Sequence, residues 1–183
     1  MPGAENEAGW SNGNVPAEHA IRGFHGVTFL LDSAAKTAAI LTDVFGFKEV
    51  AREGVIRFKV AGTIHGAVVD IYEAKGFLPG RQGTGSVHHV AFRATDDAEQ
   101  AAMAKKLTET HGLYATEQKD RNYFRSVYFR EPGGILFEIA TDIPGFAVDE
   151  PVESLGEELK LPSFLEAHRA EIESVLPSLG KAA

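Results

Sequence analysis

The sequence contains no cysteine, which excludes disulfide bonds, thiolate metal sites and cysteine nucleophiles. It also has no run of about 18 apolar residues, the length that a transmembrane helix requires. The first twenty residues lack the basic start and apolar core of a secretory signal peptide, so we expect a cytoplasmic location and no membrane partner. Basic residues are in deficit, with 18 Lys and Arg against 26 Asp and Glu. Nucleic-acid binding is therefore not expected, because it needs a basic face.

The chain does have the composition of a globular domain, with 183 residues of which 44% are hydrophobic and 24% charged. Residues 1–19 are rich in Gly, Asn, Ala and Glu without periodicity, which predicts a flexible leader or linker. Residues 20–146 carry regular patterns, and residues 147–183 are typical of a helical tail. Pro162 can open the last helix of this tail. We expect its apolar stripe to pack on the body or on a second subunit.

The body of the chain contains an internal repeat, with one module at residues 21–75 and another at residues 86–142. The first module opens with His25-Gly-Val-Thr-Phe29, and the second opens with His88-His-Val-Ala-Phe92. Each opening run reads as a strand and leads through polar residues into a helical pattern that ends at a glycine. The repetition of these signals predicts two copies of one supersecondary unit.

Polar residues in front of the two helical patterns predict where the helices begin. Asp32 or Ser33 can cap the first helix. Asp96, with Glu99 three residues later, resembles a capping box for the second helix.

Three strand-like runs follow each helical pattern. They are Phe47–Ala51, Val55–Ala61 and Ala67–Tyr72 in the first module, and Leu113–Glu117, Tyr123–Phe129 and Ile135–Ala140 in the second. Each module is thus predicted to fold as β-α-β-β-β. Together the modules predict an α+β fold, a curved mixed and mostly antiparallel sheet with both long helices on its convex side.

Two residues capable of binding a metal stand in strands where apolar residues would be expected. Strand alternation places His89 with Ala91, and Glu138 with Ala140, on faces opposite to the apolar residues that surround them. A small residue beside each polar one indicates a cavity floor. A buried carboxylate is costly unless it is paired, so Glu138 needs a metal, an arginine or access to water. The residues alone leave a purely structural explanation open.

The joint pattern resembles the vicinal oxygen chelate superfamily, which includes glyoxalase I and the extradiol dioxygenases. The most specific likeness is to the C-terminal half of hydroquinone-type ring-cleaving dioxygenases. It is carried by Val87-His-His-Val-Ala-Phe92, Asp120-Arg-Asn-Tyr-Phe-Arg-Ser-Val-Tyr-Phe-Arg-Glu-Pro-Gly-Gly134, Leu136-Phe-Glu-Ile-Ala-Thr-Asp142 and Pro144-Gly-Phe-Ala-Val-Asp-Glu-Pro151. It covers roughly residues 17 to 177.

The resemblance implies a set of roles at matching positions. It implies that His89 and Glu138 are ligands of Fe(II), with Mn(II) or another divalent metal as an alternative. It implies that His88, Arg121 and Tyr128 stand near the metal as catalytic residues. These residue types suit the chemistry, because an imidazole can move a substrate proton while a guanidinium and a phenol can stabilise oxyanions. The implied substrates are a small hydroquinone- or catechol-like aromatic and dioxygen.

The chain departs from the family in length, because members are usually about twice as long and take a further His ligand from their N-terminal half. His25 is the candidate for this missing ligand. An ungapped alignment of the two modules pairs His25 with His88, whereas counting back from Asp32 and Asp96 pairs it with His89. We therefore expect a homodimer, or association with a separately encoded N-terminal half, to complete the site.

Three functions remain open at this point. The first is a non-heme Fe(II) extradiol-type dioxygenase, or the metal-bearing half of one. The second is a glyoxalase- or epimerase-like enzyme, in which a divalent metal polarises a carbonyl. The third is a non-enzymatic module that binds a small molecule, as bleomycin-resistance proteins do. The Arg121 and Tyr128 positions favour the first function, and the missing half favours the third.

Overall fold

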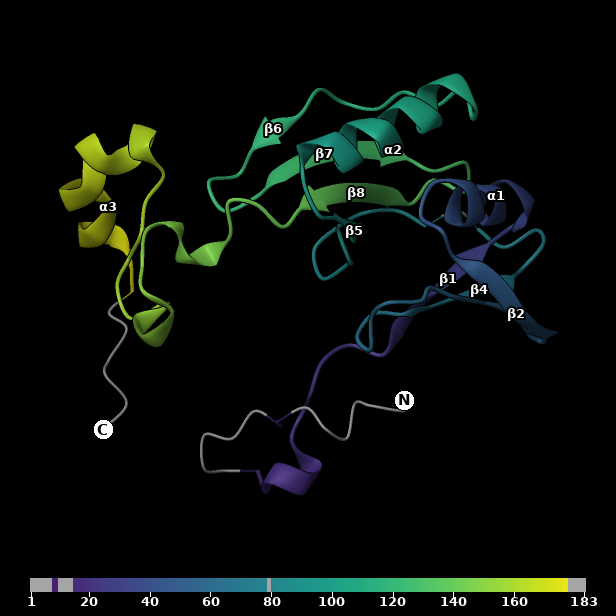
Figure 1. The fold of residues 1–183 in the computed structure, drawn as a ribbon, viewed down its shortest axis with the longest axis horizontal. Helices are drawn as coiled ribbons and strands as arrows, with labels where there is room; N and C mark the ends of the chain where they lie inside the picture. Colours follow the sequence, from purple (N-terminus) through teal and green to yellow (C-terminus); the bar gives the residue numbers. More distant parts are fainter. Residues whose placement is uncertain (1–7, 10–14, 79, 178–183) are drawn as a thin grey trace.

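The computed structural model describes residues 8–9, 15–78 and 80–177 of the chain, and most of the expected leader lies outside them (Figure 1). The first module contains β1 (Gly26–Leu31), α1 (Ala35–Asp43), β2 (Lys48–Glu53), β3 (Val55–Lys59) and β4 (Val68–Glu73). The second contains β5 (Val90–Ala94), α2 (Asp97–Glu109), β6 (Lys119–Asp120), β7 (Arg125–Arg130) and β8 (Leu136–Thr141). The predicted β-α-β-β-β order is confirmed in both modules.

Each module builds its own four-stranded sheet, in the order β1-β4-β3-β2 for the first module and β5-β8-β7-β6 for the second. Strand β1 runs parallel to β4, and β5 runs parallel to β8. All other neighbouring strands are antiparallel. The α+β class with mixed, mostly antiparallel pairing is therefore confirmed. The strands form two sheets, however, where the sequence predicted a continuous one. Strands β1 and β5 are each left at an open sheet edge.

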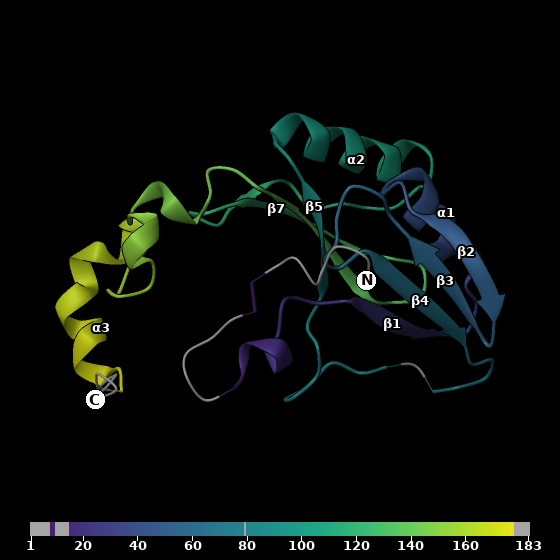
Figure 2. The same ribbon diagram turned by 60° about the horizontal axis from the view of Figure 1, so that its bottom comes forward.

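Beyond its first residues, which stay close to the loop between β6 and β7, the tail after β8 lies apart from the two sheets in both ribbon views (Figures 1 and 2). It consists of short 3-10 helical turns at Phe146–Val148, Val152–Ser154 and Ser163–His168, followed by α3 (Arg169–Val175). A further 3-10 turn, Ala17–His19, precedes the first module. Pro162 stands directly before the Ser163–His168 turn, as predicted for the start of the last helical segment. In the part of the chain that the structure describes, no helix has the length and apolar character needed to cross a bilayer.

One of the two predicted helix caps forms. Asp96 accepts a hydrogen bond from the Glu99 amide at 2.9 Å, and Glu99 in turn accepts one from the Thr95 amide, which completes a capping arrangement at α2. Helix α1 is different, because its N-cap residue is Ala34 and no side chain caps it. The Asp32 carboxylate instead accepts a hydrogen bond from the amide of Gly76, in the connector between the modules.

The predicted strand at Leu113–Glu117 is wrong as an extended strand. Only a single bridge forms there, between Ala115 and Phe129, and the paired strand β6 comes later at Lys119–Asp120. The Thr116 side chain and backbone both bond to Tyr128, which fixes the segment without a ladder. The edge strand of the second module is consequently short, which limits pairing with other chains.

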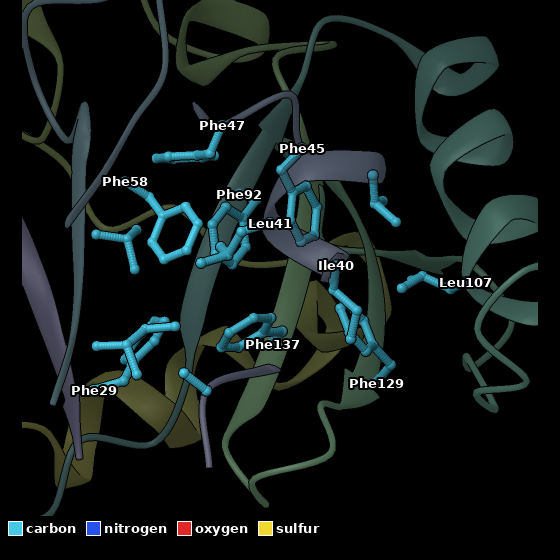
Figure 3. Close-up of a cluster of buried hydrophobic side chains, with 14 of the residues drawn as sticks. Phe29, Ile40, Leu41, Phe45, Phe47, Phe58, Phe92, Leu107, Phe129 and Phe137 are labelled. Carbon is cyan, nitrogen blue, oxygen red and sulfur yellow. The ribbon is translucent and has the colours of Figure 1, made fainter. Parts of the chain in front are cut away.

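The core is one aromatic cluster shared by the two modules (Figure 3). Phe45 of the first module stacks on Phe92 of the second with ring centroids 4.0 Å apart. Phe29 and Phe137 approach across the same boundary at 5.3 Å. Because these rings are almost fully buried, the modules form a single packed body with their cores facing each other. The face of each sheet opposite this core is called its open face below.

A buried carboxylate also ties the modules together. Glu131, in the turn between β7 and β8, is 2% exposed and accepts hydrogen bonds from the amides of Gly133 and Ile135. Its third donor is the hydroxyl of Thr37 on α1 of the other module. The carboxylate therefore makes up for its burial with three donors, one of which crosses the module boundary.

We expect Thr37→Val to lower the free energy of unfolding by about 1–3 kcal/mol, because it removes a donor from the buried Glu131 carboxylate at similar side-chain volume. Chemical denaturation measures this change. Thr42→Val is the matched control, since Thr42 lies on the exposed side of the same helix and should change stability by at most about 0.5 kcal/mol. Equal effects of the two substitutions would contradict a role for this hydrogen bond.

Candidate metal centre

Strands β8 and β5 place Glu138 and His89 on the open face of the second sheet. Phe137 and Ile139 point into the core and are fully buried, so the residue between them points the other way. Glu138 is the register partner of Ala91 on β5, and His89 stands two positions before that alanine. The strand alternation predicted from the sequence is confirmed for both residues.

The two side chains meet directly. His89 Nε2 lies 2.7 Å from Glu138 Oε2, and the other carboxylate oxygen accepts a hydrogen bond from the Ser126 hydroxyl. Glu138 is 2% exposed, while about a third of the His89 side chain is exposed. Within the described residues, no lysine or arginine pairs with this carboxylate. A deeply buried carboxylate thus has only an imidazole and a hydroxyl beside it.

These two residues fit a divalent metal. Ligands held about 2.1 Å from one ion at right angles lie about 3 Å apart, close to the observed separation of the two donor atoms. An imidazole and a carboxylate are also two of the three ligands in the facial set used by non-heme Fe(II). Among the described residues, no third His, Asp or Glu joins them to form a metal-binding group. A single chain therefore offers an incomplete set.

His88 contacts the ring of His89 through the nitrogen that lies away from Glu138. The Nδ1 atoms of His88 and His89 are 2.9 Å apart, and their rings are nearly perpendicular. One of these nitrogens must carry a proton, and the other must accept the hydrogen bond that it donates. If His89 used its Nε2 lone pair for a metal, its Nδ1–H would donate to His88, which fixes the orientation of the ligand ring.

Tyr128 and Arg121 complete the group that the sequence placed near the metal. Tyr128 is the register partner of Glu138, and its ring centroid lies 5.9 Å from that of His89. The guanidinium carbon of Arg121 lies 5.6 Å from the centroid of the Tyr128 ring. The structure thus brings together His88, His89, Arg121, Tyr128 and Glu138.

His25 lies elsewhere, on the first module. It is exposed just before β1, near Asp70, whose pKa is lowered mainly by Arg57 and to a smaller extent by His25. It does not join His89 and Glu138 within one chain. A role for His25 as a metal ligand would therefore require a second chain.

The register of the two sheets decides which residues are equivalent. Asp70 pairs with Thr28 just as Glu138 pairs with Ala91, so the two carboxylates hold corresponding positions. Two residues before Thr28 stands Gly26, which therefore corresponds to His89 and leaves His25 opposite His88. Strand pairing supports the ungapped alignment of the modules.

An ion pair occupies the place in the first sheet that the candidate centre occupies in the second. Arg57 binds both oxygens of Asp70, at 2.8 and 2.7 Å, and corresponds in register to Tyr128. The Arg57 hydrogen bond and charge lower the pKa of Asp70. Sequence reasoning missed this pair, although an Arg and an Asp on adjacent strands of the repeat were a signal for it. The first module pairs its carboxylate with a guanidinium, whereas the second pairs it with an imidazole and a hydroxyl.

A hollow of about 390 Å³ opens above His89 and Glu138. Its lining includes the small residues Ala91 and Ala140, as the sequence predicted for a cavity floor. Tyr123 and Phe146 line the same hollow, and Phe146 was not singled out by sequence reasoning. Two larger hollows, of about 570 and 480 Å³, lie along the Gly-rich connector between the modules, the second reaching His88.

The paired modules and the site on the second sheet are features of one family. The model of the glyoxalase/bleomycin resistance protein/dioxygenase superfamily matches residues 16–139, and the chain belongs to this superfamily. Among curated proteins, the chain is 45% identical over 174 residues to MhqO of Bacillus subtilis strain 168, which is provisionally named a ring-cleaving dioxygenase. It is 34% identical over 166 residues to the chlorohydroquinone/hydroquinone 1,2-dioxygenase of Sphingobium indicum.

The matches cover most of this chain but only part of the relatives. They include 94% of the chain and 55% of MhqO, and 89% of the chain and 51% of the Sphingobium enzyme. The chain thus spans about half the length of the curated relatives it matches. A crystal structure of a Bacillus subtilis protein, described provisionally as a dioxygenase, superposes with a TM-score of 0.82 at 44% identity, covering 93% of this chain and 56% of that one.

A shorter protein matches about two thirds of the chain. The fosfomycin resistance protein FosX from Mesorhizobium loti superposes with a TM-score of 0.51 at 26% identity. The match covers 66% of this chain and 92% of FosX. About two thirds of this chain therefore matches nearly the whole of a shorter protein.

Proposed function

We propose that this chain carries the metal centre of an Fe(II)-dependent ring-cleaving dioxygenase that acts on a hydroquinone- or catechol-like aromatic. The observation that carries the proposal is the 2.7 Å approach of His89 Nε2 to the buried carboxylate of Glu138, which no lysine or arginine of the described residues pairs with. The activity for which the Sphingobium relative is named supports the substrate class. Cleavage of the C1–C2 bond of hydroquinone, next to a hydroxyl-bearing carbon, is the extradiol-type outcome that we propose here.

In this proposal His89 and Glu138 hold the metal, and Fe(II) is favoured over Mn(II) or another divalent ion. When bound, the metal would supply a place where substrate oxygen and dioxygen react side by side. Ser126 holds the second oxygen of Glu138 and so fixes the orientation of the carboxylate. The buried position of Glu138 keeps water from competing for the ligand.

The surrounding residues would manage protons and negative charge. His88 accepts the His89 Nδ1–H at its own Nδ1, so its Nε2 carries a proton that it can donate to a substrate oxygen. The Tyr128 hydroxyl can donate a hydrogen bond to a developing oxyanion. Arg121, stacked over the Tyr128 ring, adds positive charge at the same edge of the site.

The third protein ligand is proposed to come from a second chain, either a twin copy or a separately encoded N-terminal half. The open face of the first sheet exposes Leu30 and Tyr72, which are apolar and directly paired in register. The open edges of β1 and β5 offer unpaired backbone groups. In a symmetric dimer, a face of one chain meets its twin, so His25 of one copy can approach the His89–Glu138 pair of the other.

The test combines assembly with activity. The purified chain, reconstituted with Fe(II) without oxygen, is expected to sediment as a dimer and to consume oxygen when hydroquinone is added. His25→Ala in the same assay reports whether His25 is the third ligand. An inactive monomer that becomes active only with a supplied N-terminal half would replace the homodimer. A metal-loaded assembly that consumes no oxygen with hydroquinone or catechol would contradict the dioxygenase and favour a glyoxalase- or epimerase-like reaction.

A further inference from the structure

The start of the segment that follows β8 lines one side of the hollow at the candidate metal centre. After Asp142 the chain turns, and the Gly145 amide donates a hydrogen bond to the Tyr123 carbonyl at 2.9 Å. The ring of Phe146 stacks on that of Tyr123, with centroids 5.3 Å apart and planes inclined by 24°. Both rings line the hollow that contains His89 and Glu138. The aromatic rings of Tyr123 and Phe146 therefore lie beside the side chains of His89 and Glu138 in one hollow.

A polar contact holds these rings together at their outer end. The Tyr123 hydroxyl donates a hydrogen bond to Asp149 Oδ2 at 3.1 Å, and the Asn122 side chain contacts the same oxygen. Burial and the Asp149 carboxylate raise the pKa of Tyr123, so the phenol stays protonated and continues to donate. The segment is thus attached to the loop that carries Arg121 at both of its ends.

The composition of the hollow indicates what shape of ligand fits. Ala91 and Ala140 leave open space above the floor, and Phe124 and Phe146 add apolar surface at the side. The Phe146 side chain is 65% exposed although its backbone is anchored, so much of its ring is free for a further contact. Aromatic rings prefer offset-stacked or edge-to-face neighbours, which a flat ring offers and a saturated ring does not.

We propose that Tyr123 and Phe146 form an aromatic wall that packs against the substrate ring above His89 and Glu138, and that Asp149 holds this wall in place. The inference rests on the proposed function, because it takes the ligand of the hollow to be a planar aromatic. It adds specificity-determining residues that lie outside the metal-ligand and acid–base set. The wall selects aromatic rings over saturated rings that carry the same hydroxyl groups.

The test measures binding in the absence of turnover. The full chain is loaded with Zn(II), which has no redox chemistry, and titrated calorimetrically with hydroquinone and with trans-1,4-cyclohexanediol. The wild-type chain is expected to prefer hydroquinone. Phe146→Ala is expected to weaken hydroquinone binding roughly 3–10-fold, to leave diol binding unchanged and to leave Zn(II) affinity unchanged. Phe164→Ala is the matched control, because Phe164 is another largely exposed phenylalanine in the tail and does not line the hollow.

Two further variants test the attachment. Tyr123→Phe and Asp149→Ala each remove the same hydrogen bond and are expected to weaken hydroquinone binding equally, with no added loss in the double variant. Unchanged hydroquinone binding in Phe146→Ala would overturn the wall and leave the proposed function standing. An equal loss for hydroquinone and the diol would overturn the stacking contact. A wild-type chain that holds Zn(II) but binds no hydroquinone would overturn the proposed substrate class and the wall with it.

Discussion

Glutamine in place of Glu138 is expected to abolish metal retention while leaving the chain folded. The amide matches the carboxylate in size, and its oxygen can still accept the hydrogen bond from Ser126. It lacks the negative charge that a divalent ion needs, so we expect metal affinity to fall by at least about 100-fold, the upper range found for residues that only support a ligand. Metal analysis after dialysis measures the loss, and thermal unfolding checks the fold.

The first module provides the matched control. Asp70 holds the position equivalent to Glu138 but is paired with Arg57, so Asp70→Asn should leave metal content unchanged. His89→Ala should reproduce the loss seen with Glu138→Gln. Full metal occupancy in either His89→Ala or Glu138→Gln would show that the ligand pair is wrong. Metal loss in Asp70→Asn would move the site to the first sheet.

The face on which Glu138 lies could be predicted from sequence because strand alternation is a local property. Phe137 and Ile139 are strongly apolar, so burying them forces the residue between them to the other face. The capping box at Asp96 and Glu99 was equally local, since both residues lie within one turn of the helix that they cap. Features determined by residues close in the chain were therefore predicted well.

Features set by distant residues were not predicted. Asp32 does not cap α1, because its carboxylate binds the Gly76 amide in the connector between the modules, 44 residues later in the chain. The segment Leu113–Glu117 has a strand-like pattern, but only Ala115 forms a bridge, and the ladder begins later. In both cases the competing partner becomes visible only when the chain is folded.

The same distinction between local and distant determinants applies to the residues of the candidate site. The residues His88, His89, Arg121, Tyr128 and Glu138 could be named because a family resemblance covers their motifs, and the structure brings all five together. Phe146 was missed, because its place in the site depends on the turn after β8, which brings its ring against that of Tyr123. A lone phenylalanine in a loop gives no periodic signal.

Substitution of His88 or Arg121 is expected to lower the turnover of hydroquinone strongly. In the assembled Fe(II) enzyme at saturating metal, His88→Ala should lower hydroquinone turnover roughly 10²–10⁴-fold, the usual contribution of a proton-transfer residue. Arg121→Ala should lower hydroquinone turnover roughly 10²–10³-fold, because it removes the positive charge beside Tyr128 that would stabilise the substrate oxyanion. Oxygen uptake measures both effects, and metal analysis at saturation should show unchanged content. Arg52→Ala, on the first sheet, and His168→Ala, in the tail, are the controls.

His88→Gln separates two roles of the His88 ring. Glutamine can still accept a hydrogen bond from His89 Nδ1–H, but it cannot transfer a proton to the substrate. We therefore expect this variant to keep the metal affinity that His88→Ala weakens and to remain slow. Recovery of both metal affinity and turnover would mean that His88 acts only by orienting His89. Unaltered turnover in both His88→Ala and Arg121→Ala would return these residues to structural roles and leave Tyr128 as the remaining candidate for oxyanion stabilisation.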